Sequence, residues 1–277
     1  AQIYVEPIEG LSEDFIKGVD ISSVLAEEDS GVVYYDEDGN ETDLFKLLAD
    51  AGVNYIRVRV WNDPYDAEGH GYGGGNNDVE KAAIIGERAA KYGMKLLVDF
   101  HYSDFWADPK KQFTPKAWAS YSVDQKAEAL YDYTVESLNT IIKAGADVGM
   151  VQIGNEINAG LAGEKRIDSI CKLLSSASKA VRETSQDVKV VVHYTNIEKI
   201  GDMEKKAQQL VDYNVDYDVF GVSYYPYWHG TFEKLQKTMT TIIETYDKEV
   251  MIAETSYLYT DQDGDGHSNS VNPDTEG

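Results

Sequence analysis

Two glutamates each come directly after an apolar, strand-like segment. QIGNE at 152–156 ends in Glu156, and VMIAE at 250–254 ends in Glu254. A carboxylate just past the end of a buried strand is held at the rim of a sheet, where catalytic groups of α/β barrels lie. The two segments therefore predict an acid/base pair at one active site.

Such a pair could cleave a glycosidic bond with retention. One carboxyl group protonates the leaving oxygen, and the other attacks the anomeric carbon. We expect Asn155 to donate its amide to a sugar hydroxyl. We also expect Arg59 to approach Glu254 and hold it ionised, because a nearby positive charge lowers a carboxyl pKa. Glu156 needs the opposite change, a raised pKa.

Each of these residues also has a purely structural interpretation. A lone glutamate at a strand end is often a surface charge or a neighbour of a helix N-cap. His101 and His193, which also end strand-like runs, could be hydrogen-bonded core residues. Three tryptophans follow strands and fit either a packed core or platforms for sugar stacking: Trp61, Trp106 and Trp228.

Composition narrows the protein class. The chain has 277 residues, 42% hydrophobic and 27% charged, as expected for one large soluble domain. Its net charge of −24 disfavours nucleic acid and anionic membranes as partners, so a neutral substrate is expected. Cys171 is the only cysteine and lies in a helical apolar pattern, which predicts a core residue. No apolar run is long enough to span a bilayer, and the first residues lack a targeting pattern, as expected of a mature product.

The elements that must position the glutamates alternate between strands and helices. Strands are predicted at 17–21, 55–60, 95–100, 149–154, 188–193, 217–224 and 249–253. Helices are predicted at 43–51, 78–92, 123–144, 165–183, 203–211 and 231–246. Near-continuous apolar strands indicate a parallel sheet covered on both faces.

Polar and aromatic residues follow nearly every predicted strand. A barrel brings all those strand ends to one mouth, whereas an open sheet has a single switch point, so a (β/α)8 barrel is favoured. The glycine-rich segment 71–77 lacks a phosphate-binding pattern and is interpreted as a mobile surface loop.

Several motifs together resemble glycoside hydrolases of clan A, and within it family 53, the endo-β-1,4-galactanases. They cover nearly the whole chain: GVDISS at 18–23, IRVRVW at 56–61, DFHYSD at 99–104, WADP at 106–109, QIGNE at 152–156, GVSYYP at 221–226 and AET at 253–255. The Asn-Glu pair is common to the clan, whereas the block from DFHYSD to WADP is far more specific.

The resemblance implies retaining hydrolysis of β-1,4-galactan in pectin, with Glu156 as acid/base and Glu254 as nucleophile. It places further residues around the sugar: Arg59, His101, Trp106, Asn155, His193, Tyr225 and Trp228. Tyr224 and Tyr225 cannot be separated by pattern, because adjacent strand residues face opposite sides.

The resemblance also implies an eighth strand and a last helix, but the residues after Glu254 are few and polar. We therefore expect residues 1–277 to form a single catalytic barrel domain that lacks its last βα unit at the C-terminus. The segment 261–269 carries oxygen-bearing side chains at every second position, with glycines between them, the spacing that wraps a hard cation. Some family members bind calcium here, which implies a structural Ca2+ site at Asp263, Asp265, the backbone of His267, and Asn269. A solvated acidic turn is the alternative.

Two other functions remain open. A related clan A enzyme, a β-mannanase or cellulase, would keep both glutamates but not the WADP block. A non-catalytic carbohydrate-binding barrel should lose one glutamate. We expect a monomer that acts on a polysaccharide and is secreted, periplasmic or held at the cell surface.

Overall fold

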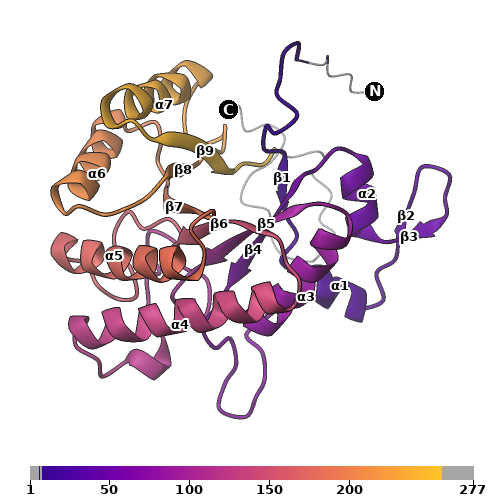
Figure 1. Cartoon of the computed structure of the whole chain (residues 1–277), viewed down its shortest axis with the longest axis horizontal. Helices are drawn as coiled ribbons and strands as arrows, with labels where there is room; N and C mark the ends of the chain where they lie inside the picture. Colours follow the sequence, from indigo (N-terminus) through magenta and orange to yellow (C-terminus); the bar gives the residue numbers. More distant parts are fainter. Residues whose placement is uncertain (1–5, 7, 258–277) are drawn as a thin grey trace.

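Seven parallel strands form one curved sheet in the computed structural model, which describes residue 6 and residues 8–257 (Figure 1). The strands are paired in the order β1-β4-β5-β6-β7-β8-β9, so β1 and β9 are the two edges of the described sheet. Their bounds are β1 Gly18–Asp20, β4 Tyr55–Val60, β5 Lys95–Phe100, β6 Val148–Ile153, β7 Lys189–Tyr194, β8 Val219–Ser223 and β9 Glu249–Glu254.

Helices connect successive strands and cover the outer face of the sheet (Figure 1). Helix α4 packs against α5, and α6 packs against α7. The helices are α1 Val24–Asp29, α2 Leu44–Asp50, α3 Val79–Lys91, α4 Val123–Lys143, α5 Ile167–Thr184, α6 Ile200–Asp212 and α7 Phe232–Tyr246, with a 3-10 turn at Lys116–Trp118. A short hairpin of β2 (Tyr34–Tyr35) and β3 (Glu41–Thr42) lies apart from the sheet.

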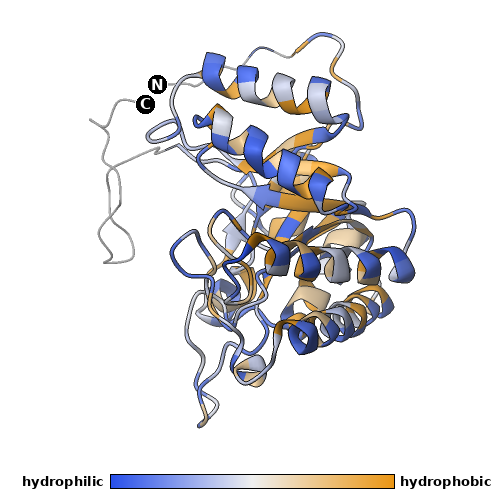
Figure 2. Cartoon of the chain, turned by 90° about the vertical axis from the view of Figure 1, so that its left-hand side faces the viewer, coloured by the Kyte–Doolittle hydropathy of each residue, from blue (hydrophilic) through white to orange (hydrophobic). Residues whose placement is uncertain are grey.

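The main core lies between the sheet and these helices. Alternate strand residues such as Val58, Val98 and Val192 are buried in one cluster with apolar helix residues. Figure 2 shows the same division, with hydrophobic strands at the centre and hydrophilic outer faces on the helices. Burial of both sheet faces explains why the strands are near-continuous apolar runs.

The inner face of the sheet carries a second, smaller set of side chains arranged in layers. Leu97, Met150, Val191 and Val219 form an apolar cluster there. Two residues further along their strands, Asp99 and Gln152 are paired in register and fully buried. A polar layer therefore lies between the apolar layer and the strand ends, where the site must be built.

The structure confirms all seven predicted strands, with ends that differ by at most two residues. Helix α6 begins at Ile200 and α5 at Ile167, where the sequence predicted 203 and 165. Helix α1 and the β2–β3 hairpin were not predicted, because both are short and α1 is mostly exposed. Within residues 8–257 every helix is too short or too polar to cross a membrane.

Candidate active site

Glu156 lies just past β6 in a turn with unusual backbone geometry. Gly154 has a φ of 110° and Glu156 a φ of 46°, which is rare for a residue with a side chain. A Cβ at position 154 would lie 2.6 Å from Ile157 Cγ2. The strained turn is stabilised by the bond from Ile157 N to His193 O, at 3.0 Å. Strain of this kind is tolerated where the surrounding structure holds a functional group in place.

The carboxyl group of Glu156 is tuned as a proton donor. Its burial raises the pKa to about 7, and the negative charge of Glu254 acts in the same direction. The Ser223 hydroxyl donates to Glu156 Oε1 at 2.7 Å, which partly offsets both effects. A carboxyl group with a pKa near neutrality can act as acid in one step and base in the next.

We expect Glu156→Gln to stabilise the fold at alkaline pH. The raised pKa of Glu156 means that its contribution to stability is fully present below its unfolded pKa, near 4.5, and lost as pH rises through about 7. The neutral amide avoids this loss, so the free energy of unfolding at pH 8 should exceed that of the wild type by up to about 3 kcal/mol. Urea denaturation at pH 5 and pH 8 measures it. An equal difference at both pH values would contradict the account.

Glu254, at the end of β9, is held ionised. Arg57 Nη2 donates to its Oε1 at 2.9 Å, and the Tyr225 hydroxyl donates to its Oε2 at 2.9 Å. Burial alone would raise the pKa of Glu254, but the Arg57 charge outweighs it and the pKa is lowered. An ionised, oriented carboxylate opposite a neutral carboxylic acid can act as a nucleophile.

The structure corrects the prediction that Arg59 holds Glu254, since Arg57 does so. Both side chains project from β4 to the same face, but Arg59 lies one step nearer the mouth. Its guanidinium lies 4.3 Å from the centre of the Trp106 ring and donates to Gly74 O at 2.7 Å. Arg59 therefore lines the mouth beside an exposed aromatic ring.

Arg57 is the centre of a buried polar network. Its guanidinium also donates to Asp99 Oδ2 at 2.8 Å and to Asp20 Oδ2 at 3.2 Å. Neutral acceptors complete its shell, with Gln152 Oε1 and Asn155 Oδ1 within hydrogen-bond distance. Shared carboxylates hold the pKa of Arg57 above its usual value although burial opposes this.

Asn155 is buried and serves this network. Its Oδ1 accepts from Arg57 and Gln152, while its Nδ2 donates to Ala107 O at 2.8 Å. One amide hydrogen is thus used within the protein, and the remaining one is what the amide could offer a sugar hydroxyl.

The two predicted histidines are both fully buried, so neither lies at the surface of the mouth. Trp61 Nε1 and Ala107 N both donate to His101 Nδ1, so His101 Nε2 carries the proton and donates to Asp99. His193 lies between Asn155 and Ser223, and burial lowers its pKa to about 4, which keeps the ring neutral. Both rings support the residues that face the cleft.

The aromatic residues divide into core and cleft. Trp61 is 0% exposed and belongs to the core, whereas Trp106 is 40% and Trp228 53% exposed. The hydroxyl of Tyr225 bonds Glu254, while that of Tyr224 donates to Gly230 O away from the carboxylates, which separates the two adjacent tyrosines. The exposed rings and Tyr225 are available to stack against sugar faces.

A cavity of about 1210 Å³ opens between β1 and β9, and its lining includes Arg57, Arg59, Trp106, Tyr225 and Glu254. The glycine-rich segment 71–77 borders the mouth. A Cβ on Gly74 would lie 3.1 Å from the Trp61 ring, so the segment contacts the core there, although residues 71–74 are exposed as expected of a surface loop.

Five residues of the network were not singled out from the sequence: Asp20, Arg57, Asp99, Gln152 and Ser223. Three are charged, and two of those, Arg57 and Asp99, lie within apolar strands, where an unpaired charge is costly. A charged residue within an apolar strand is therefore the pattern that could have identified Arg57 and Asp99. Ser223 offers no comparable pattern.

The predicted calcium ligands Asp263, Asp265, His267 and Asn269 lie outside the described residues. Within residues 8–257, no cluster of three or more His, Cys, Asp or Glu side chains could hold a metal ion.

Comparisons with known proteins agree with this arrangement. Residues 16–276 match the sequence profile described as Glycosyl hydrolase family 53. An endo-beta-1,4-galactanase of Bacillus subtilis (strain 168) is 54% identical over 97% of this chain, which spans 63% of that protein's length. The arabinogalactan endo-beta-1,4-galactanase A of Aspergillus niger is 35% identical over 87% of this chain and 70% of its own length.

A solved structure, the Ignisphaera aggregans GH53 catalytic domain, superposes with a TM-score of 0.94 and 41% identity. The match covers 97% of this chain and 76% of that one, so the seven strands and their helices are those of the family's barrel. The chain belongs to glycosyl hydrolase family 53.

Proposed function

We propose that this protein is a retaining endo-β-1,4-galactanase, with Glu156 as acid/base and Glu254 as nucleophile. The observation that carries the proposal is the opposite tuning of the two carboxyl groups, with the pKa of Glu156 raised to about 7 and that of Glu254 lowered. The relatives named as galactanases support β-1,4-galactan as the substrate.

In the first step, Glu254 Oε attacks the anomeric carbon while Glu156 donates its proton to the glycosidic oxygen. The carbon–oxygen bond to the leaving sugar breaks, and a glycosyl ester forms on Glu254. Arg57 and Tyr225 hold the attacking carboxylate in a fixed orientation. Positioning of this kind lowers the entropic part of the barrier.

In the second step, the ionised Glu156 takes a proton from water, and the oxygen of that water attacks the anomeric carbon. The ester to Glu254 breaks, and Glu156 is again protonated. The bond from the Ser223 hydroxyl to Glu156 Oε1 favours the ionised form that this step requires. Two displacements give net retention of configuration.

Release of reducing ends from linear β-1,4-galactan, β-mannan and carboxymethylcellulose tests the proposal. We expect hydrolysis of galactan and products several sugars long at early times, as internal cleavage requires. Preference for mannan or carboxymethylcellulose would indicate another clan A activity. Binding of galactan without hydrolysis would indicate a carbohydrate-binding barrel.

We further propose that the segment 261–269 binds a structural calcium ion through Asp263, Asp265, the backbone carbonyl of His267, and Asn269. The support is the alternation of oxygen ligands and glycines in the sequence. At a calcium concentration 100-fold above the dissociation constant, the ion would stabilise the fold by about 2.7 kcal/mol. Chelation should lower the melting temperature and leave the rate per folded molecule unchanged at low temperature. An unchanged melting curve would exclude the site.

We propose that the protein acts outside the cell or at its surface, because a polysaccharide is too large to be taken up intact. We also propose that it acts as a monomer. Assay of culture fractions and light scattering of the purified protein test these two points. Activity confined to the cytoplasm, or a stable dimer, would contradict them.

A further inference from the structure

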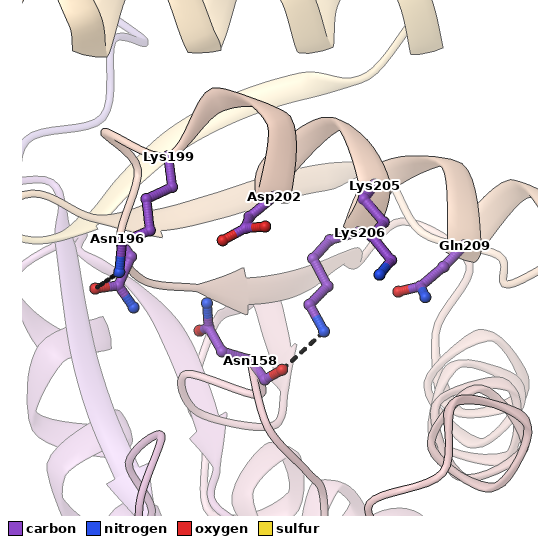
Figure 3. Close-up of a pocket in the computed structure, with 7 residues that line it drawn as sticks. All are labelled: Asn158, Asn196, Lys199, Asp202, Lys205, Lys206 and Gln209. Atoms are coloured by element: carbon purple, nitrogen blue, oxygen red, sulfur yellow. Dashed lines mark hydrogen bonds between the residues drawn. The ribbon is translucent and has the colours of Figure 1, made fainter.

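A polar pocket of about 320 Å³ lies between the N-terminal half of α6 and the segments after β6 and β7 (Figure 3). We call it the lysine pocket. Its lining includes Asn158, Asn196, Lys199, Asp202, Lys205 and Lys206. Figure 3 shows the charged groups of α6 projecting toward Asn158 across the pocket.

The charge of this pocket opposes that of the whole protein. Three lysines and one aspartate line it, in a chain whose net charge is −24. Lys206 is partly buried, and burial followed by repulsion from Lys205 lowers the pKa of its ammonium group. Lys206 Nζ donates to Asn158 O at 2.7 Å. An ammonium group has three N–H donors, so the other two can donate to a ligand. An anion entering here would relieve the repulsion between the lysines.

The rest of the lining suits hydroxyl groups. The carboxylate of Asp202 forms no hydrogen bond or ion pair with any residue of 8–257, so it is free to accept. The Asn196 amide contacts Lys199 Nζ only weakly, at 3.4 Å. A sulfate offers no hydroxyl donor at neutral pH for Asp202 and would be repelled by it. A sugar acid presents a carboxylate and several hydroxyls together.

The lysine pocket is joined to the acid/base residue. Asn158 is two residues after Glu156, and its side chain makes paired bonds with the backbone of Thr195, both at 2.8 Å. Two residues of chain span at most roughly 7 Å. Glu156 protonates the oxygen of the departing sugar, so the pocket lies near the residue that the leaving group meets. Arg59 and Trp106 contact each other at the mouth near β4 and β5, away from this pocket.

We infer that the lysine pocket binds a uronic acid unit attached to the leaving-group portion of the substrate. This inference rests on the proposed glycosidase function, because it assigns the pocket to the same substrate chain. Lys199 and Lys205 hold the carboxylate, while Asp202 and the Asn196 amide receive the hydroxyls. The enzyme is thereby directed to galactan carried on an acidic polysaccharide.

The test compares the wild type with the double variant Lys199→Gln/Lys205→Gln. Both lysines are exposed, and neither contacts the catalytic carboxylates. We expect kcat/KM on neutral linear galactan to be unchanged. On galactan linked to a galacturonate-containing backbone, kcat/KM should fall about fivefold, and the preference of the wild type for that substrate should weaken at 0.5 M salt.

The charge-matched control is Lys143→Gln/Lys237→Gln, which removes two exposed lysines from α4 and α7. It should leave both substrates unaffected. An equal loss on both substrates in the pocket variant, or no loss on either, would overturn the inference.

Direct binding separates this inference from the proposed function. Titration with digalacturonate, followed by NMR, should shift resonances of α6 in the wild type and much less in the pocket variant. Galactobiose should not produce those shifts. Failure of digalacturonate to bind, or equally strong binding of inorganic sulfate, would overturn the uronate assignment even if galactan is hydrolysed. If galactan is not hydrolysed, the proposed function fails while the titration still reports on the pocket.

Discussion

Replacement of Glu254 by alanine should abolish turnover on every substrate. The variant retains the acid but has no group to form the glycosyl ester, so we expect kcat to fall by about 10⁴-fold or more. Activated aryl β-galactosides should not rescue it, because a better leaving group does not replace a missing nucleophile. Assays with galactan and with an aryl glycoside measure both losses.

Glu156→Ala is the matched comparison. Here the nucleophile is intact, and an aryl leaving group needs little protonation, so substantial activity on the aryl glycoside should remain while activity on galactan is lost. Equal residual activity of the two variants on both substrates would mean that the roles are assigned wrongly.

Replacement of Arg57 by methionine should destabilise the protein and impair catalysis together. Arg57 pairs with Glu254, Asp99 and Asp20, and its removal leaves buried carboxylates without a counter-charge. Breaking a buried ion pair in this way costs about 3–5 kcal/mol. Urea denaturation at pH 7 measures that loss.

The pH dependence of the Arg57 variant identifies the cause. The pKa values of Glu254 and Asp99 are lowered in the fold, so their contribution to stability is present above their unfolded pKa values and lost as pH falls through the lowered values. Without Arg57, the deficit should be largest at neutral pH and shrink as the carboxyls protonate. The acid limb of kcat/KM should move to higher pH, because the nucleophile is no longer held ionised.

Arg59→Met is the control for this prediction. Arg59 does not contact Glu254 and instead lies over Trp106. We expect it to raise KM while leaving the acid limb in place. If the acid limb moved in the Arg59 variant and not in the Arg57 variant, the ion pair described for Glu254 would be wrong.

The two arginines show how far sequence can assign a site. Alternation along β4 places Arg57 and Arg59 on one face, and this much is readable from the pattern. Which of them reaches Glu254 depends on the relative height of β4 and β9 around the sheet, which the sequence does not specify. Arg59 was chosen because it is nearer the strand end, whereas the buried position belongs to Arg57.

The histidines show a second limit. Their positions at strand ends were correctly predicted, but their partners come from elsewhere in the chain. The His101 ring accepts hydrogen bonds from Trp61, just past the end of β4, and from Ala107 in its own loop. The His193 ring is hydrogen-bonded to Ser223 of β8. Such contacts depend on packing rather than on local pattern. The strands, by contrast, were predictable because each is a local apolar run that can be recognised without knowledge of its partners.

Trapping of the glycosyl-enzyme tests the central claim most directly. A 2-deoxy-2-fluoro-β-galactoside with an activated leaving group slows hydrolysis of the ester, so the intermediate should accumulate and be found by mass spectrometry of proteolytic peptides. The account predicts one label, on the peptide that contains Glu254, and none in the Glu254→Ala variant. A label on any other carboxylate, or turnover of this reagent with inversion and no covalent adduct, would contradict it.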